Sequence, residues 1–155
     1  MNRVFCVLIV TATLALSGIA AFAPSRAGNE SATGDYVRSN GSHMVINAIR
    51  HKNGTVTGGM YFQSATGQII VVAVDAMTVI DNSAYIHGIV VLSEQNPSLV
   101  GRHSYHRVVD NGEGAGSDPD RAATFANLPS PVADPIAFLS STSPILEGNI
   151  QVRQG

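Results

Sequence analysis

The segment His43–Gln63, HMVINAIRHKNGTVTGGMYFQ, decides the fold class. It consists of two runs in which apolar and polar residues alternate, separated by Asn53-Gly54. Asn and Gly both tolerate a positive φ, and this pair between alternating runs is the strongest short signal for a β-hairpin. The segment therefore predicts two antiparallel strands, at 43–51 and 55–63.

The same strand-and-turn pattern continues through the chain, with turn residues about every ten positions. The run Gln68–Val79 is apolar on both faces, which predicts a central strand that is covered on both sides. Asp134–Leu139 fits either one helical turn or a short edge strand. Further strands are expected at 84–92, 102–110 and 146–153.

Six strands in succession predict an all-β domain, an antiparallel meander closed into a small β-barrel. Consecutive hairpins favour pairing between neighbours, and closure removes edges that such hydrophobic strands would leave exposed. A two-sheet β-sandwich is the alternative.

The chain begins with the features of an export signal. A basic start at Arg3 precedes an apolar run from Val4 to Phe22, and Ser25-Arg26-Ala27 offers small residues for cleavage after Ala27. We expect residues 1–27 to be a signal peptide, 28–42 a flexible N-terminal segment and 43–155 a single β-domain. The protein is then secreted or periplasmic. The alternative is an uncleaved anchor, because the apolar run is about as long as a spanning helix.

Composition narrows the possible partners. The only cysteine, Cys6, lies in the signal, so the exported domain has no disulfide and no cysteine nucleophile. Loss of Arg3 and Arg26 with the signal leaves seven basic and 11 acidic residues, a formal net charge of −4. Without a basic cluster, neither nucleic acid nor an anionic membrane surface is an expected partner.

An acidic, glycine-rich segment follows the strand expected at 102–110. Asp110, Asn111, Glu113, Asp118 and Asp120 can offer the oxygen ligands that Ca²⁺ prefers, although their spacing does not match the helix-flanked calcium loop. The alternative is a solvated turn whose Asp and Asn side chains bond the local backbone. Calcium is the only cofactor that the sequence suggests.

Four residues on the expected strands are candidate binding residues, namely Asp75, His87, His103 and Tyr105. If the strands at 84–92 and 102–110 pair, His87 can meet His103 or His106 across them. His103 and His106 are three apart and so face opposite sides. A zinc site needs three or four convergent ligands, so the pattern favours histidines without metal. Asp75, in an apolar strand, must be hydrogen-bonded or protonated if it is buried.

Three stretches carry a resemblance: VINAIRHKNGTVTGGMYFQ (Val45–Gln63), VVAVDAMTVIDNSAYIHGIVV (Val71–Val91) and VVDNGEGAGSDPD (Val108–Asp120). Over Met44–Phe125 the chain resembles a group of uncharacterised secreted bacterial β-domain proteins with a DNGEG…DPD loop. The last stretch is the most specific. The resemblance implies a secreted β-domain and implies no activity.

The chain departs from the pattern of that group at two places. Val45-Ile46 stands where an aromatic residue commonly precedes Asn47, and Asp75 stands where the central strand is commonly apolar or carries Cys.

No catalytic constellation is evident in the sequence. The chain lacks a Gly-x-Ser-x-Gly elbow, a glycine-rich phosphate loop and a paired-carboxylate signature. We therefore expect an exported, non-catalytic β-domain that binds a small ligand or an envelope or surface protein. The alternative is a hydrolase-like enzyme with a polar site at the barrel mouth, formed by residues such as Asp75, His87 and His103.

Overall fold

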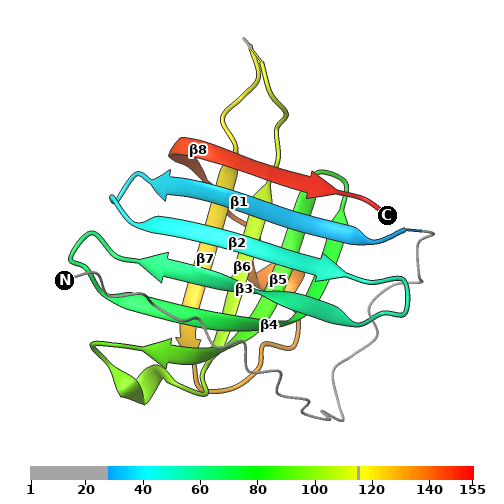
Figure 1. The fold of residues 1–155 in the computed structure, drawn as a ribbon. Coiled ribbons are helices and arrows are strands. Elements are labelled where there is room, and N and C mark those ends of the chain that lie inside the picture. The colour runs from blue at the N-terminus through cyan, green and yellow to red at the C-terminus, as the bar shows by residue number, and fades with distance from the viewer. Residues whose placement is uncertain (1–27, 115) are drawn as a thin grey trace, which may run out of the picture.

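The chain folds into a closed barrel of eight antiparallel strands, in which each strand pairs with the next and β8 returns to β1 (Figure 1). The computed structural model describes residues 28–114 and 116–155. The expected signal peptide lies outside them. The elements are β1 (Glu30–Arg38), β2 (His43–Arg50), β3 (Val56–Gln63), β4 (Ile69–Ile80), β5 (Ser83–Ser93), the 3₁₀ turn η1 (Pro97–Leu99), β6 (His103–Val109), β7 (Arg121–Leu128), α1 (Pro135–Phe138) and β8 (Ser143–Arg153).

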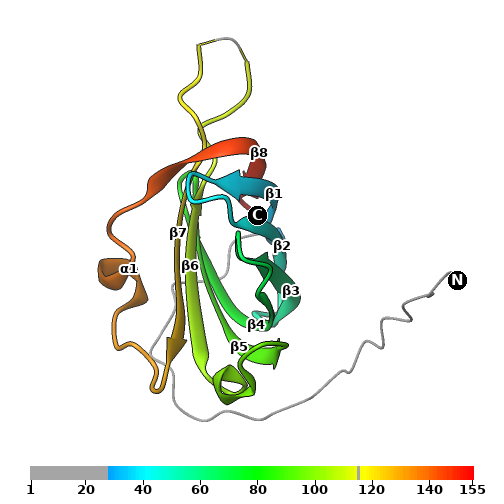
Figure 2. The same cartoon turned by 90° about the vertical axis from the view of Figure 1, so that its left-hand side faces the viewer.

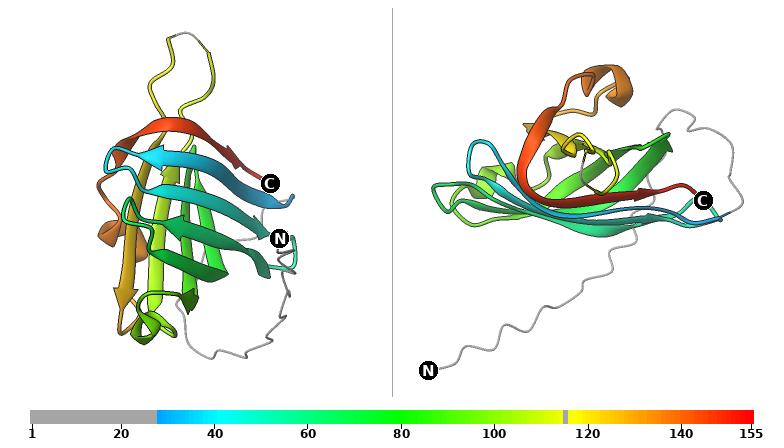
Figure 3. Two further views of the ribbon diagram at one scale, coloured as in Figure 1. Left: turned by 60° about the vertical axis from the view of Figure 1, so that its left-hand side comes forward. Right: turned by 90° about the horizontal axis from the view of Figure 1, so that it is seen from above.

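The barrel is flattened into two walls whose strands cross steeply. One wall contains β8, β1, β2 and β3, and the other contains β5, β6 and β7 (Figures 1 and 3). The segment that carries α1 lies outside β6 and β7 (Figure 2). Among the described residues, no helix is long and apolar enough to cross a membrane.

The predicted barrel is confirmed, as are the six predicted strands. Residues 28–42 are not a flexible segment, because β1 occupies Glu30–Arg38 and pairs with both β2 and β8. The strand β7 was also not predicted. Of the two alternatives for 134–139, the helical turn is the one observed, with the Asp134 side chain accepting from the Ile136 and Ala137 amides.

Side chains from all eight strands fill the barrel interior. They form one contiguous buried cluster, so the interior is a packed core, as in other small barrels. Glycine is required where strands approach closely: a Cβ on Gly88 would collide with the Ala73 carbonyl oxygen. Representative members of the cluster, one from each strand in order, are Ala32, Ile46, Met60, Val72, Ile86, Val108, Ala122 and Ile150.

The first half of strand β4, residues 69–75, is covered on one face only, in contrast to the prediction, whereas further along the strand Thr78 on the outward face is buried. Its inward residues Val72 and Val74 are buried, whereas Ala73 and Asp75 are exposed and Val71 is half-buried. The meander supplies no second layer over this part of the outer surface of the barrel. An apolar strand face therefore remains at the surface.

A histidine side chain lies inside the apolar core. His106 is 2% exposed, and its Nε2 lies 2.8 Å from Ser104 Oγ and its Nδ1 3.2 Å from Thr124 Oγ1. Burial lowers the pKa of His106 to about 3, and the nearby Arg38 charge acts in the same direction. His106 is therefore neutral in the folded protein at neutral pH.

This burial predicts a loss of stability in acid. The unfolded chain takes up a proton on His106 near pH 6.5, but the folded chain does so only near pH 3. As the pH decreases between these values, the free energy of unfolding therefore also decreases, by at most about 1.4 kcal/mol per pH unit. In His106→Gln this contribution is absent, so the difference in unfolding free energy between wild type and variant shrinks from pH 7 to pH 4.

Urea unfolding at pH 7, 5.5 and 4 measures this difference. His51→Gln in the β2–β3 hairpin is the control and should keep the wild-type slope. A His106→Gln variant with the same pH dependence as the wild type would contradict the assignment.

Candidate functional site

Three of the four candidate binding residues form a continuous hydrogen-bonded chain. His87 Nδ1 lies 2.5 Å from Asp75 Oδ1, and His87 Nε2 lies 3.0 Å from His103 Nδ1. The two imidazole rings are stacked, with centroids 5.2 Å apart and an interplanar angle of 24°. Of the two neighbours that the sequence allowed for His87, His103 and His106, the structure shows His103.

Strand geometry explains how these residues meet. A β-bulge between Val74 and Ala76 leaves Asp75 without a direct partner on β5, at the level of His87. Across β5 and β6, His87 faces Tyr105 and Ile89 faces His103, so the two histidines are diagonal neighbours on one face.

This face is the outer surface of the barrel. The cluster is therefore not at the barrel mouth, where the enzymatic alternative placed it. Along β5 the inward residues are Ile86 and Val90, which belong to the core, so His87 between them points outward. His106, three residues after His103, points inward, as the alternation predicted.

Tyr105 supports the cluster from below and is not accessible to a ligand. It is 2% exposed, its ring lies 4.6 Å from that of His87, and its hydroxyl accepts a hydrogen bond from the Val132 amide. Phe138 of α1 packs edge-on against it. Tyr105 thus fixes His87 in place through the segment that covers β6 and β7.

The carboxylate of Asp75 sets the tautomers of the chain. A carboxylate only accepts, so His87 Nδ1 carries a proton, and in the form in which both rings are neutral His87 Nε2 accepts from His103 Nδ1. Desolvation lowers the pKa of His103, His87 adds to this effect, and Asp75 opposes it. The result is a neutral His103 whose Nε2 lone pair faces outward, beside a His87 side chain that is only 8% exposed.

Two carboxylates of the predicted calcium loop close the barrel. The strands β7 and β8 pair directly at only two positions, Arg121 with Pro144 and Ala122 with Ser143. Beyond them, Asp120 Oδ2 accepts from the Ile150 amide at 2.8 Å.

The neighbouring carboxylate makes the equivalent bond one step further along β8. Asp110 Oδ2 accepts from the Val152 amide at 2.9 Å. The second oxygen of each carboxylate binds the loop itself, since Asp120 Oδ1 accepts from the Asn111 amide and Asp110 Oδ1 from the Gly112 amide. We call these two carboxylates and the β8 amides that they bind the carboxylate seam.

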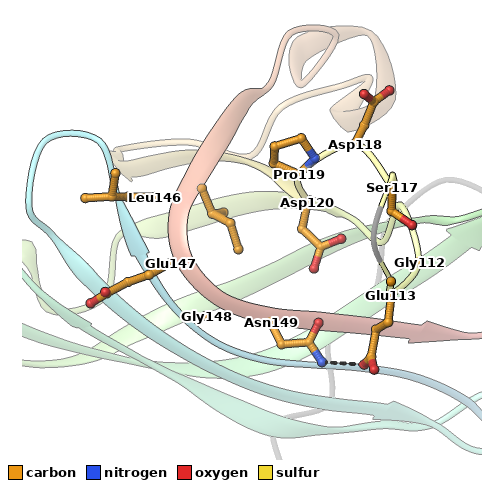
Figure 4. A pocket seen from close by; sticks show the side chains of 12 residues that line it. Gly112, Glu113, Ser117, Asp118, Pro119, Asp120, Leu146, Glu147, Gly148 and Asn149 are labelled. Carbon is orange, nitrogen blue, oxygen red and sulfur yellow. Dashed lines mark hydrogen bonds between the residues drawn. The ribbon is translucent and has the colours of Figure 1, made fainter.

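A shallow pocket of about 490 Å³ lies between this loop and β8 (Figure 4). Glu113 accepts from Asn149 Nδ2 at 2.9 Å across it, and Asp118 on its rim makes no side-chain hydrogen bond among the described residues. Within residues 28–114 and 116–155, no three His, Cys, Asp or Glu side chains converge as ligands for a metal ion. Calcium binding stays a prediction, and the seam accounts for the order of Asp110 and Asp120 without it.

An outward apolar row was missed as a functional feature. The register places Val45, Tyr61, Val71 and Leu92 directly opposite one another across β2, β3, β4 and β5. Leu92 is 45% exposed and its neighbour Val91 51%. The two apolar faces of 68–79 were a sequence signal for this surface, but we interpreted them as burial on both sides.

No protein-family model, curated protein or solved structure matches the chain. The resemblance to secreted β-domains therefore remains an expectation.

The seam predicts that Asp120 is the most important residue of the acidic loop for stability. Asp120→Ala leaves the Ile150 and Asn111 amides without their acceptor, and should lower the free energy of unfolding by about 2–4 kcal/mol. Asp118→Ala, in the same loop, is the matched control and should change it by less than about 0.5 kcal/mol. Chemical denaturation measures both, and equal effects of the two substitutions would refute this role of Asp120.

Proposed function

We propose that the protein is an exported, non-catalytic module that binds a partner protein through the outer surface of its barrel. The observation that carries this proposal is the outward apolar row of β2–β5, in which Val45, Tyr61 and Val71 are half-buried and Leu92 is exposed, extended by the exposed Val91. Contiguous apolar surface on a folded domain marks an interaction site more often than chance exposure.

The filled interior supports the same proposal. Small barrels bind ligands inside only when the side chains leave a cavity, and here one core cluster from all eight strands occupies the interior. This core favours binding at the outer surface. The Asp75–His87–His103 chain lies on the same outward face as the apolar row, with the Ile89–Ala73 pair between them, because His87, Ile89 and Val91 are successive outward positions of β5.

The combination matches the usual anatomy of a protein interface. Such interfaces have an apolar, aromatic centre and a rim of polar groups that fix orientation. Tyr61 and Leu92 supply the first, and Asp75 and His103 supply the second. Export to a periplasmic or secreted location is the part of the proposal that rests on residues 1–27 alone. The proposal includes no nucleic-acid partner, and no membrane partner if the signal is cleaved.

The enzymatic alternative is favoured by one observation, the relay from Asp75 through His87 to His103. Such a chain can accept a proton at His103 Nε2 and stabilise the resulting charge with the carboxylate. Among the described residues, however, no hydroxyl side chain is hydrogen-bonded to His103 to serve as a nucleophile. The binding module therefore remains the proposal.

Site-specific photo-crosslinking in intact cells of the source organism tests whether the apolar row binds a partner protein. A photoreactive residue at position 91 should give a discrete protein adduct, whereas the same residue at Thr33, an exposed position of β1, should not. Leu92→Asp introduces a charge into the apolar row and should abolish the adduct at position 91. Because Leu92 is 45% exposed, this substitution should leave the melting temperature almost unchanged.

Two results would overturn the proposal. One is the same pattern of adducts at positions 33 and 91. The other is an adduct at position 91 that persists unchanged in Leu92→Asp.

A further inference from the structure

We propose that His87 and His103 form a binding site for a divalent transition-metal ion, with Asp75 as the residue that orients His87. This inference is independent of the proposed partner protein. It rests on the two ring nitrogens that face each other across β5 and β6 at 3.0 Å.

The separation of the two nitrogens fits coordination by one ion. Metal–nitrogen bonds to histidine are about 2.0–2.1 Å long. Two such nitrogens lie about 2.9 Å apart when they subtend a right angle at the metal, and about 3.4 Å apart at the tetrahedral angle. The observed 3.0 Å between His87 Nε2 and His103 Nδ1 falls between these values. The separation of the two nitrogens therefore needs to change by only a few tenths of an ångström, and both rings must turn so that their lone pairs meet at the ion.

The groups behind His87 match those behind histidine ligands in metalloproteins. A ligating histidine usually donates its second ring N–H to a carboxylate, which fixes the tautomer and makes the ligating nitrogen more basic. Asp75 accepts this N–H from His87 at 2.5 Å. Tyr105 packs on the same ring, so His87 presents Nε2 in one fixed direction.

Binding moves the proton of His103 from one ring nitrogen to the other. In the metal-free pair the His103 Nδ1 proton lies between the two nitrogens. When the ion binds, both nitrogens donate a lone pair to it, His103 Nδ1 gives its proton to solvent and His103 Nε2 takes one up, so the ring stays neutral and no net proton is released. No oxidant or reductant is involved.

The remaining coordination positions are open. The described residues provide no third His, Cys, Asp or Glu at this point, so water or a donor atom of a bound molecule completes the shell. Open positions are typical of functional sites, whereas structural zinc sites are closed. Two imidazoles with water favour Cu²⁺ over Ni²⁺ and Zn²⁺ by the usual order of stability.

The surface offers a matched control. Asp35 and His43 form a second carboxylate–imidazole pair, 2.6 Å apart, on the outer face of β1 and β2. This pair has the carboxylate, but its only aromatic neighbour is Tyr61 and not a second histidine. A difference in metal affinity between the His87–His103 site and the Asp35–His43 pair therefore isolates the contribution of the two facing imidazoles.

Titration of the purified protein with Cu²⁺, followed by calorimetry and electron paramagnetic resonance, tests the site. The wild type should bind one Cu²⁺ with hyperfine coupling from two imidazole nitrogens. His103→Gln should weaken binding at least tenfold and leave one coupled nitrogen. Asp75→Asn should weaken binding by about 10–100-fold, as is usual for a residue that orients a ligand. His43→Gln should change the affinity less than twofold.

Circular dichroism shows whether each variant is folded, so a failure to fold is not mistaken for the loss of a ligand. The proposal is overturned if His103→Gln binds Cu²⁺ as tightly as the wild type. It is equally overturned if His43→Gln, and not His103→Gln, removes the bound ion.

Discussion

The carboxylate seam is the constraint on which the rest of the structure depends. A meander becomes a barrel only if its last strand finds partners on both sides, and β8 has a complete ladder only with β1. Asp110 and Asp120 replace the missing part of the β7 ladder by accepting from two alternate amides of β8. Unpaired backbone donors in this position would be costly and would leave a reactive edge.

Closure in turn determines where chemistry can occur. Because the walls meet, their inward side chains pack into one core, and His106, Ser104 and Thr124 enter it as a group of polar side chains that bond to one another. Groups that can act on other molecules are left on the outer surface of the barrel. There the bulge at Asp75 turns a carboxylate towards His87, and the apolar face of β4 stays uncovered.

Local patterns predicted much of this structure. Asn53-Gly54 and the period-two alternation gave the hairpins, and the same alternation placed His87 near His103. The strand β1 was missed because its sequence ESATGDYVR is mostly small or polar and carries only Ala32 and Tyr36 as buried apolar residues, and β7 because it is rich in alanine. The seam could not be predicted, since Asp110 and Val152 are 42 positions apart and only the closed barrel brings them together.

Backbone amide exchange at Ile150 and Val152, followed by NMR, tests the closed barrel most directly. These two amides have carboxylate acceptors and no strand partner on that side. If the seam closes the barrel, they should exchange as slowly as core amides such as that of Ile46 in β2. Exchange as fast as that of Gly114 at the exposed loop tip would show that β8 is open on this side, and would contradict the account.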